Sequence, residues 1–169
     1  MREDLIRAVD PDRHLYGSRE APVRVVEYGD FECPYCRAAA PVLRELVDGS
    51  DDRVALVFRH FPLFTTHPFA LTAALAAEAA GDRFWPMHDL LFAHQDRLTD
   101  ADLAGYGEQI GVTGVVGEPA QAFRVAVEAD YRTGISDGVR GTPTLVVDGE
   151  RYRGPVELRA LRAAVTAAA

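Results

Sequence analysis

Two cysteines, Cys33 and Cys36, stand three positions apart where a strand pattern gives way to a helix pattern. Residues 23–28 form a β-branched and nearly continuous apolar run, which is typical of a strand buried on both faces. Residues 37–47 repeat apolar side chains on one helical face, and Gly49 ends that pattern. This strand–turn–helix junction constrains the fold more than any other feature of the chain.

The remaining pattern completes an α/β core interrupted by helices. A second buried strand is predicted over 54–61, and a long helical stretch follows over 65–138. The other predicted elements are helices over about 68–81, 84–98, 99–111 and 119–138, strands over 144–147 and 151–153 joined by a turn at Asp148-Gly149, and a last helix from Pro155. We therefore expect a core from 1–64 and 139–169, with 1–20 as an N-terminal arm and 65–138 as an inserted helical domain. Pro41 should kink the helix that contains it.

Length, charge and cysteine content exclude several classes of protein. The 169 residues fit one domain with a sizeable insertion, and they can bury a core without disulfide staples. The formal net charge of −8 argues against binding nucleic acid or an anionic membrane, because both need a cluster of cations. Two cysteines are too few for a secreted disulfide scaffold. No apolar run approaches the ~18 residues of a membrane span.

The first ten residues contain no apolar stretch of signal-peptide length and no small-residue cleavage site. We therefore expect a cytoplasmic location. A mature protein whose leader has been removed would have the same sequence, which leaves export as the alternative.

The cysteine spacing favours redox chemistry. Cys33 falls at a helix N-terminus, where free backbone N–H groups and the helix dipole lower a thiol pKa and produce the attacking thiolate. Pro34 suits the first helical position, and Tyr35 completes the motif. Cys36 lies one turn inward, close enough to attack a mixed disulfide on Cys33. Zinc is the rival, but the pair supplies only two of four ligands, and His60, His67, His88 and His94 form no tight pair. We expect no metal and no cofactor.

Other candidate residues allow two interpretations. Glu27 is an acid in an apolar strand, either buried with a raised pKa that suits a proton acceptor, or reaching solvent at the strand end. Asp30 and Glu32 are interpreted as solvated loop charges. From base rates alone Pro143 would be an ordinary trans proline, because few X–Pro bonds are cis. The histidines and Trp85 have no partner pattern, and Trp85 is expected in the core of the helical stretch.

Three segments together resemble the DsbA-like branch of the thioredoxin superfamily, across roughly residues 14–169. They are Val25-Val26-Glu27-Tyr28-Gly29-Asp30-Phe31-Glu32-Cys33-Pro34-Tyr35-Cys36, Phe58-Arg59-His60-Phe61-Pro62-Leu63 and Gly141-Thr142-Pro143-Thr144. The resemblance implies a thioredoxin core with a helical domain inserted after the second strand. It also implies that Cys33 is the nucleophile, that Cys36 is the resolving thiol and that Glu27 assists proton transfer. Pro143 would be cis and face the cysteines, and the Thr142 backbone would pair with an extended substrate.

The sequence departs from the strongly oxidising members at two positions. Tyr35 stands where they carry His, and Thr142 stands where they often carry Val. Whether the protein oxidises, reduces or isomerises its substrates is therefore open.

The resulting prediction is a monomeric protein disulfide oxidoreductase that acts on thiol- or disulfide-containing proteins and has a redox partner of unknown identity. The alternatives are a non-enzymatic metal-binding or regulatory module, and a small-molecule thiol transferase or isomerase. The paired cysteines argue against the last, because such relatives typically keep the fold without both cysteines.

Overall fold

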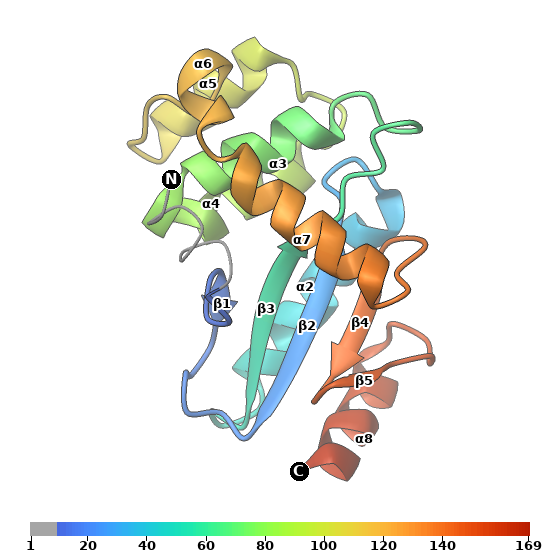
Figure 1. Cartoon of the computed structure of the whole chain (residues 1–169). Helices are drawn as coiled ribbons and strands as arrows, with labels where there is room; N and C mark the ends of the chain where they lie inside the picture. Colours follow the sequence, from blue (N-terminus) through green and yellow to red (C-terminus); the bar gives the residue numbers. More distant parts are fainter. Residues whose placement is uncertain (1–9) are drawn as a thin grey trace.

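The computed structural model describes residues 10–169. The part of the predicted N-terminal arm that falls on residues 1–9 therefore lies outside the described residues. A five-stranded mixed sheet forms the centre, with strand order β1-β3-β2-β4-β5 (Figure 1). Its strands are β1 (Leu15–Tyr16), β2 (Val23–Gly29), β3 (Val54–His60), β4 (Thr144–Val147) and β5 (Glu150–Arg151). Strands β2 and β3 are parallel, and every other neighbouring pair is antiparallel.

Strands β2 and β3 lie in the middle of the sheet because their side chains are apolar on both faces. Val25, Leu56 and Phe58 are fully buried or nearly so. Gly29 ends β2, and a Cβ there would stand 2.5 Å from the Phe58 ring. Only glycine therefore fits between the end of β2 and that ring.

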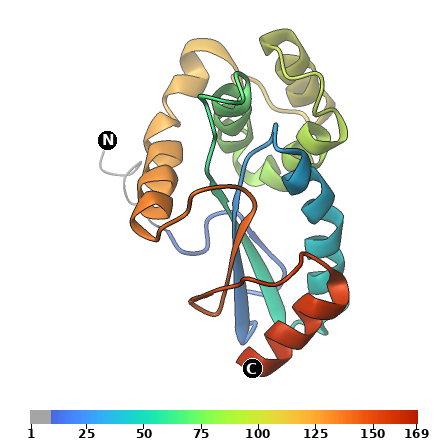
Figure 2. The same cartoon turned by 90° about the vertical axis from the view of Figure 1, so that its right-hand side faces the viewer.

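Helices cover both faces of the sheet, as predicted. Helices α2 (Pro34–Asp48) and α8 (Leu158–Ala168) pack on one face, and α7 (Arg124–Ser136) packs on the other (Figure 2). Gly134 lets α7 approach closely, because a Cβ there would stand 2.7 Å from the Phe61 ring. The burial of these amphipathic faces supplies most of the stabilisation of the layers.

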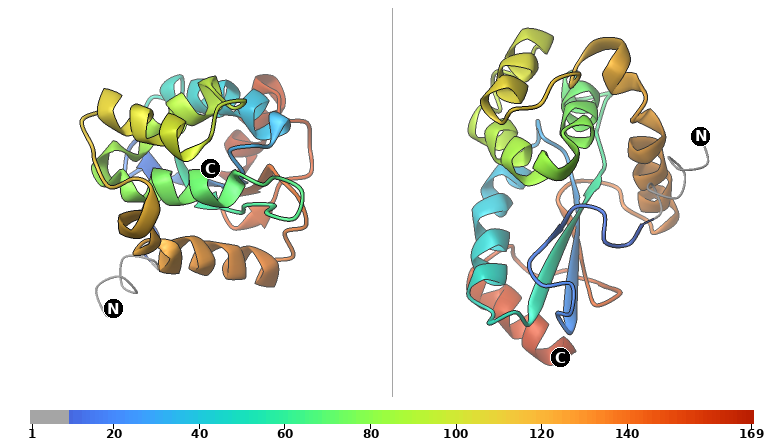
Figure 3. Two further views of the ribbon diagram at one scale, coloured as in Figure 1. Left: turned by 90° about the horizontal axis from the view of Figure 1, so that it is seen from above. Right: turned by 90° about the vertical axis from the view of Figure 1, so that its left-hand side faces the viewer.

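The remaining helices gather at one end of the molecule, beyond the ends of β2 and β3 (Figure 3). They are α3 (Ala70–Ala79), the 3₁₀ turn η1 (Gly81–Arg83), α4 (Phe84–Ala93), α5 (Asp100–Gln109) and α6 (Gly117–Gln121). Thr99 and Asp102 form the predicted capping box at the start of α5. Trp85 was expected in the core of the helical stretch, but it is partly buried between that core and the core of the sheet, and its Nε1 donates to the Leu15 carbonyl oxygen at 3.2 Å.

Two sequence predictions need correction. Residues 15–16 were expected in an arm, but they form β1 and pair with β3. The single helix predicted over 119–138 is two helices, α6 and α7, which meet near Phe123. Pro41 lies inside α2, which continues to Asp48, and the kink expected there stays a prediction.

The pairing of β4 with β2 determines where the two distant motifs meet. Thr144 lies opposite Tyr28 in the antiparallel register, so the chain just before Thr144 passes the end of β2. The turn after β2 leads directly to Cys33 and the start of α2. Residues 142–143 therefore lie beside the cysteine pair.

Candidate active site

Cys33 is the N-cap residue of α2, and Pro34 occupies the first helical position, as predicted. The Cys33 backbone N–H donates to the Asp30 carbonyl oxygen at 3.1 Å, which closes a tight turn before the helix. Both thiols are free; Cys33 is 4% exposed and Cys36 is fully buried. Tyr35, between them, is 75% exposed. The motif therefore presents an aromatic ring to solvent above a largely buried sulfur pair.

The two thiols have opposite electrostatic environments. A hydrogen bond from Cys36, together with the Thr142 side chain and the backbone N–H groups of Tyr35 and Cys36, lowers the pKa of Cys33 to about 5 despite its burial. Burial, the hydrogen bond with Cys33 and the nearby Glu27 carboxylate raise the pKa of Cys36. At neutral pH Cys33 is a thiolate and Cys36 is a thiol, which is the assignment expected of a nucleophile and a resolving residue.

Thr142, which precedes Pro143, contacts Cys33. The Thr142–Pro143 peptide bond is cis, as the resemblance implied. In its protonated form, Cys33 donates from Sγ to the Thr142 carbonyl oxygen at 3.4 Å; the thiolate cannot make this hydrogen bond. Residues more than a hundred positions apart in the chain thus form one surface.

Glu27 is fully buried in β2, so it does not reach solvent at the strand end. Neither carboxylate oxygen has a hydrogen-bond partner among residues 10–169. Burial, and secondarily the charge of Cys33, raises the pKa of Glu27 to about 8. Glu27 is therefore mainly a neutral acid at pH 7 while Cys33 is charged.

Gln95 was not identified from the sequence, yet it holds the active-site turn. Its Nε2 donates to the Phe31 carbonyl oxygen at 2.9 Å and to the Cys33 carbonyl oxygen at 2.8 Å. Gln95 follows α4, so the helical stretch contacts the backbone of Cys33 directly. No local sequence signal marks this residue.

The interpretation of Asp30 as a solvated loop charge is wrong. Asp30 is 1% exposed and accepts hydrogen bonds from the Glu32 N–H at 2.7 Å and the Leu63 N–H at 2.8 Å. Its Oδ2 also lies 2.8 Å from His67 Nδ1. An aspartate three residues before a helix N-cap is a turn signal that could have indicated this role. Glu32 is half-buried, and its Oε2 accepts from the Phe69 N–H at 2.6 Å.

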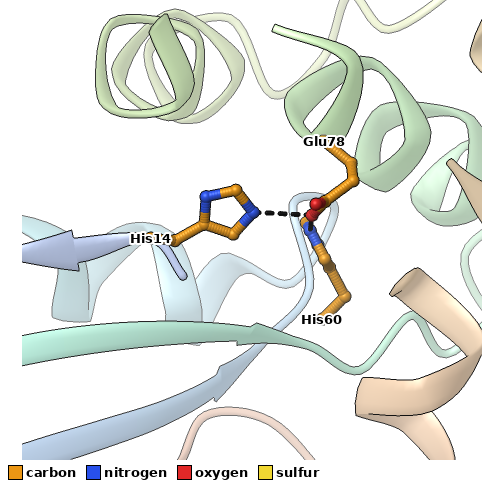
Figure 4. A group of neighbouring side chains, drawn as sticks. All are labelled: His14, His60 and Glu78. Atoms are coloured by element: carbon orange, nitrogen blue, oxygen red, sulfur yellow. Dashed lines mark hydrogen bonds and ion pairs between the residues drawn. The ribbon is translucent and has the colours of Figure 1, made fainter. Parts of the chain in front are cut away.

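A second polar cluster lies away from the cysteines (Figure 4). The ring nitrogens of His14 and His60 and a carboxylate oxygen of Glu78 lie within 4.8 Å of one another, a possible metal ligand set. Arg13 Nη1, however, donates to the same Glu78 Oε2 at 2.6 Å. A divalent cation there would face a guanidinium in the protein interior, where charge repulsion is strong.

The cluster is better explained as a buried ion-pair network. His14 and His60 contact Glu78 Oε2 at 2.6 and 2.9 Å, and Arg13 also pairs with the buried carboxylate of Asp130. Burial lowers the pKa of His14 to about 4, and hydrogen bonds from the two histidines hold the pKa of Glu78 well below its usual value despite burial. The charges of Arg13, Glu78 and Asp130 thus join the N-terminal segment to α3 and α7.

A dithiol at the start of a helix, on a mixed sheet with helices on both faces, defines a protein of the thioredoxin class. The family model described as Thioredoxin matches residues 9–167, and the chain belongs to this family. Its fold is thioredoxin-like and DsbA-like, as the sequence resemblance implied.

Solved structures agree with this assignment. A thioredoxin-like oxidoreductase from Silicibacter pomeroyi is 28% identical, with a TM-score of 0.81 over 99% of this chain and 97% of that one. The thiol-disulfide exchange protein alpha-DsbA2 from Wolbachia pipientis is 19% identical, with a TM-score of 0.81 over 100% of this chain and 99% of that one. The fold is thus one found in thiol–disulfide exchange proteins.

Among curated proteins, a Na(+)/H(+) antiporter NhaA 1 of Salinispora arenicola is 50% identical over 98% of this chain. The chain spans about a quarter of that protein, 26% of its length. Among residues 10–169, the helices are too short or too polar to cross a membrane.

The prediction of a cytoplasmic location is wrong. It rested on the start of the given sequence, whereas the matched structures include a periplasmic thioredoxin-like protein from Salmonella enterica, with a TM-score of 0.72 over 97% of this chain and 95% of that one and 22% identity.

Proposed function

We propose that this chain is a thiol–disulfide oxidoreductase that exchanges disulfides with protein substrates through Cys33 and Cys36. The observation that carries the proposal is the nearly buried Cys33 sulfur at the start of α2, beside the Thr142 carbonyl, with a lowered pKa. Such a thiolate is both a nucleophile and a good leaving group in disulfide exchange.

The proposed reaction uses Cys33, Cys36 and Glu27 in turn. In the reducing direction, the Cys33 thiolate attacks a substrate disulfide, forms a mixed disulfide and releases one substrate thiolate. The charge on Cys33, which helps to raise the pKa of Glu27, disappears in this intermediate. Loss of this charge lowers the pKa of Glu27, which releases its proton to solvent, and the resulting carboxylate accepts the Cys36 proton. The Cys36 thiolate then attacks Cys33 Sγ. The second substrate thiolate leaves, so the substrate gains two electrons and the cysteine pair loses two. The oxidising direction reverses these steps.

The surroundings of the cysteines support polypeptide substrates. Tyr35 is 75% exposed and Phe69 is 41% exposed, so both present an aromatic ring to solvent. Phe69 belongs to the turn next to Glu32, which bonds its N–H. These rings offer apolar contacts to a polypeptide whose disulfide has reached Cys33. We propose Thr142 and Pro143 as the segment that aligns such a substrate by backbone pairing.

The electrostatics favour the oxidising direction. A thiolate stabilised in the folded protein favours the reduced form, so the disulfide form becomes a better electron acceptor. With the pKa of Cys33 at about 5, we expect a reduction potential between about −120 and −270 mV, the values of DsbA and thioredoxin.

The proposed activity is that of this chain alone, which spans 26% of the length of its Salinispora relative. The name of the Salinispora relative describes a protein about four times as long, and ion transport is said of that whole protein. Within this chain, we propose that 65–138 form an inserted helical domain that shapes the substrate surface, and that the chain acts as a monomer.

Equilibration with glutathione redox buffers, followed by alkylation of free thiols, measures the reduction potential. Reduction of insulin disulfides measures exchange with a protein. We expect wild type to be active, Cys33→Ala to be inactive and Cys36→Ala to accumulate mixed disulfides. Glu27→Gln should slow resolution of the mixed disulfide more than its formation. A Cys33→Ala variant as active as wild type would refute the proposal.

A further inference from the structure

Asp30 and His67 form a pair next to the cysteine motif that the reaction above does not use. His67 Nδ1 lies 2.8 Å from the buried Asp30 Oδ2, while the His67 side chain is 20% exposed. His67 lies in the segment between β3 and α3. The Leu63 N–H donates to the same Asp30 oxygen, so Asp30 holds this segment at two points, Leu63 and His67.

This pair is built into the turn that positions Cys33. The Asp30 carbonyl oxygen accepts the Cys33 N–H at 3.1 Å, and Asp30 Oδ1 accepts the Glu32 N–H at 2.7 Å. The carboxylate that binds His67 therefore belongs to the same short segment as the nucleophile. The position of the imidazole relative to this turn is fixed by hydrogen bonds rather than by chance packing.

We propose that His67, held by Asp30, supplies a positive charge that stabilises the Cys33 thiolate. This inference rests on the proposed function, because it assigns a charge-supplying residue to the same site. The residues between the cysteines, Pro34 and Tyr35, carry no cation, and Arg37 is exposed on α2. The helical stretch thus provides from outside the motif the charge that the motif lacks.

The electrostatics agree with this role. Burial alone would lower the pKa of His67, but the hydrogen bond to Asp30 and the charges of Asp30, Glu32 and Cys33 raise it. Coupling between two sites is reciprocal, so an imidazolium that a thiolate stabilises must stabilise that thiolate equally. Oxidation removes the thiolate charge. The pKa of His67 should therefore be higher in the reduced protein than in the oxidised protein, and reduction should be accompanied by partial proton uptake at His67.

Two titrations test the inference, and neither needs a substrate. Thiolate absorbance against pH gives the Cys33 pKa in reduced wild type and in His67→Gln. NMR of the imidazole protons gives the His67 pKa in both redox states. We expect His67→Gln to raise the Cys33 pKa by about 0.2–0.7 units, the range for a partly exposed charge pair. We expect His67 to titrate higher in the reduced form, and this difference to vanish in Cys33→Ala.

Arg162→Gln is a matched control. Arg162 lies against Gly49 at the far end of α2, whose 15 residues span about 22 Å, so its removal should leave the Cys33 pKa unchanged. His67→Lys keeps a cation and should keep the Cys33 pKa below that of His67→Gln. A His67→Gln titration that coincides with wild type, or a His67 pKa independent of redox state, would overturn the inference. A shifted thiolate in a protein without insulin-reducing activity would instead refute the proposed function alone.

Discussion

Replacing Glu27 with leucine should remove a loss of folding stability that the wild-type protein undergoes as pH rises from 5 to 8. The Glu27 carboxyl is fully buried, and its pKa rises from its ordinary 4.5 to about 8 in the folded protein. Between these values the folded state holds a proton that the unfolded state has released. Stability must therefore fall as pH rises through this window, because the folded state binds more protons.

The size of the effect follows from the shift. One pKa unit corresponds to about 1.4 kcal/mol, so the part of the Glu27 window between pH 5 and 8 is about 3.5 kcal/mol. Cys33 acts in the opposite sense, because its lowered pKa makes the folded protein more stable as pH rises from about 5. Both proteins keep Cys33, so its contribution largely cancels when Glu27→Leu is compared with wild type.

Urea unfolding of the reduced proteins at pH 5, 6, 7 and 8 measures this difference. The free energy of unfolding of Glu27→Leu, minus that of wild type, should increase by about 3.5 kcal/mol from pH 5 to 8. Glu27→Gln should show the same slope with a different offset, since neither replacement titrates. The slope should persist in a Cys33→Ala background, because burial is the main cause of the shift. A difference that stays constant across these pH values would show that Glu27 titrates normally in the folded protein.

Three further predictions concern single contacts. Cys36→Ala should raise the Cys33 pKa from about 5 toward the ~8.5 of a free thiol, because the Cys36 hydrogen bond is the largest cause of the lowering; thiolate absorbance checks this. Gln95→Leu should lower the free energy of unfolding by about 1–3 kcal/mol through loss of two hydrogen bonds, whereas the exposed Gln121→Leu should change it by less than about 0.5 kcal/mol in urea. Asp130→Asn should lower the free energy of unfolding by about 3–5 kcal/mol, because it leaves Arg13 with one fewer buried anion. An unchanged thermal unfolding midpoint would contradict a stabilising role of this ion-pair network.

The sequence predicted the layers of the fold because their signals are periodic and local. The apolar run of β2, the one-sided pattern of α2 and the Thr99–Asp102 capping box all report short-range chemistry. Strand β1 was missed because two residues carry no period, and its place depends on the burial of Arg13 and His14 by distant partners. The break between α6 and α7 was missed because Phe123 packs on a cluster formed with α3, which no local pattern encodes.

In the candidate active site, too, local motifs were predicted and contacts with distant residues were missed. The cysteine motif was recognisable, and the structure places the Thr142–Pro143 segment beside it through the register of β4 on β2. Asp30 was misjudged because its partners, Leu63 and His67, come from a segment more than thirty residues away. The division of the chain into a core and an insertion at 65–138 stays a prediction.

The contacts to the turn before α2 explain how residues that do not touch sulfur can control its chemistry. The lowered pKa of Cys33 depends on hydrogen bonds from Cys36 and from the backbone N–H groups of Tyr35 and Cys36. Hydrogen bonds weaken steeply with misalignment, so small movements of this turn would change the thiolate's stabilisation. Asp30 fixes the turn from the side of the sheet, and Gln95 fixes the carbonyl oxygens of Phe31 and Cys33 from the helical stretch. The helices beyond the sheet therefore act on Cys33 through its backbone, independently of the substrate surface proposed for them.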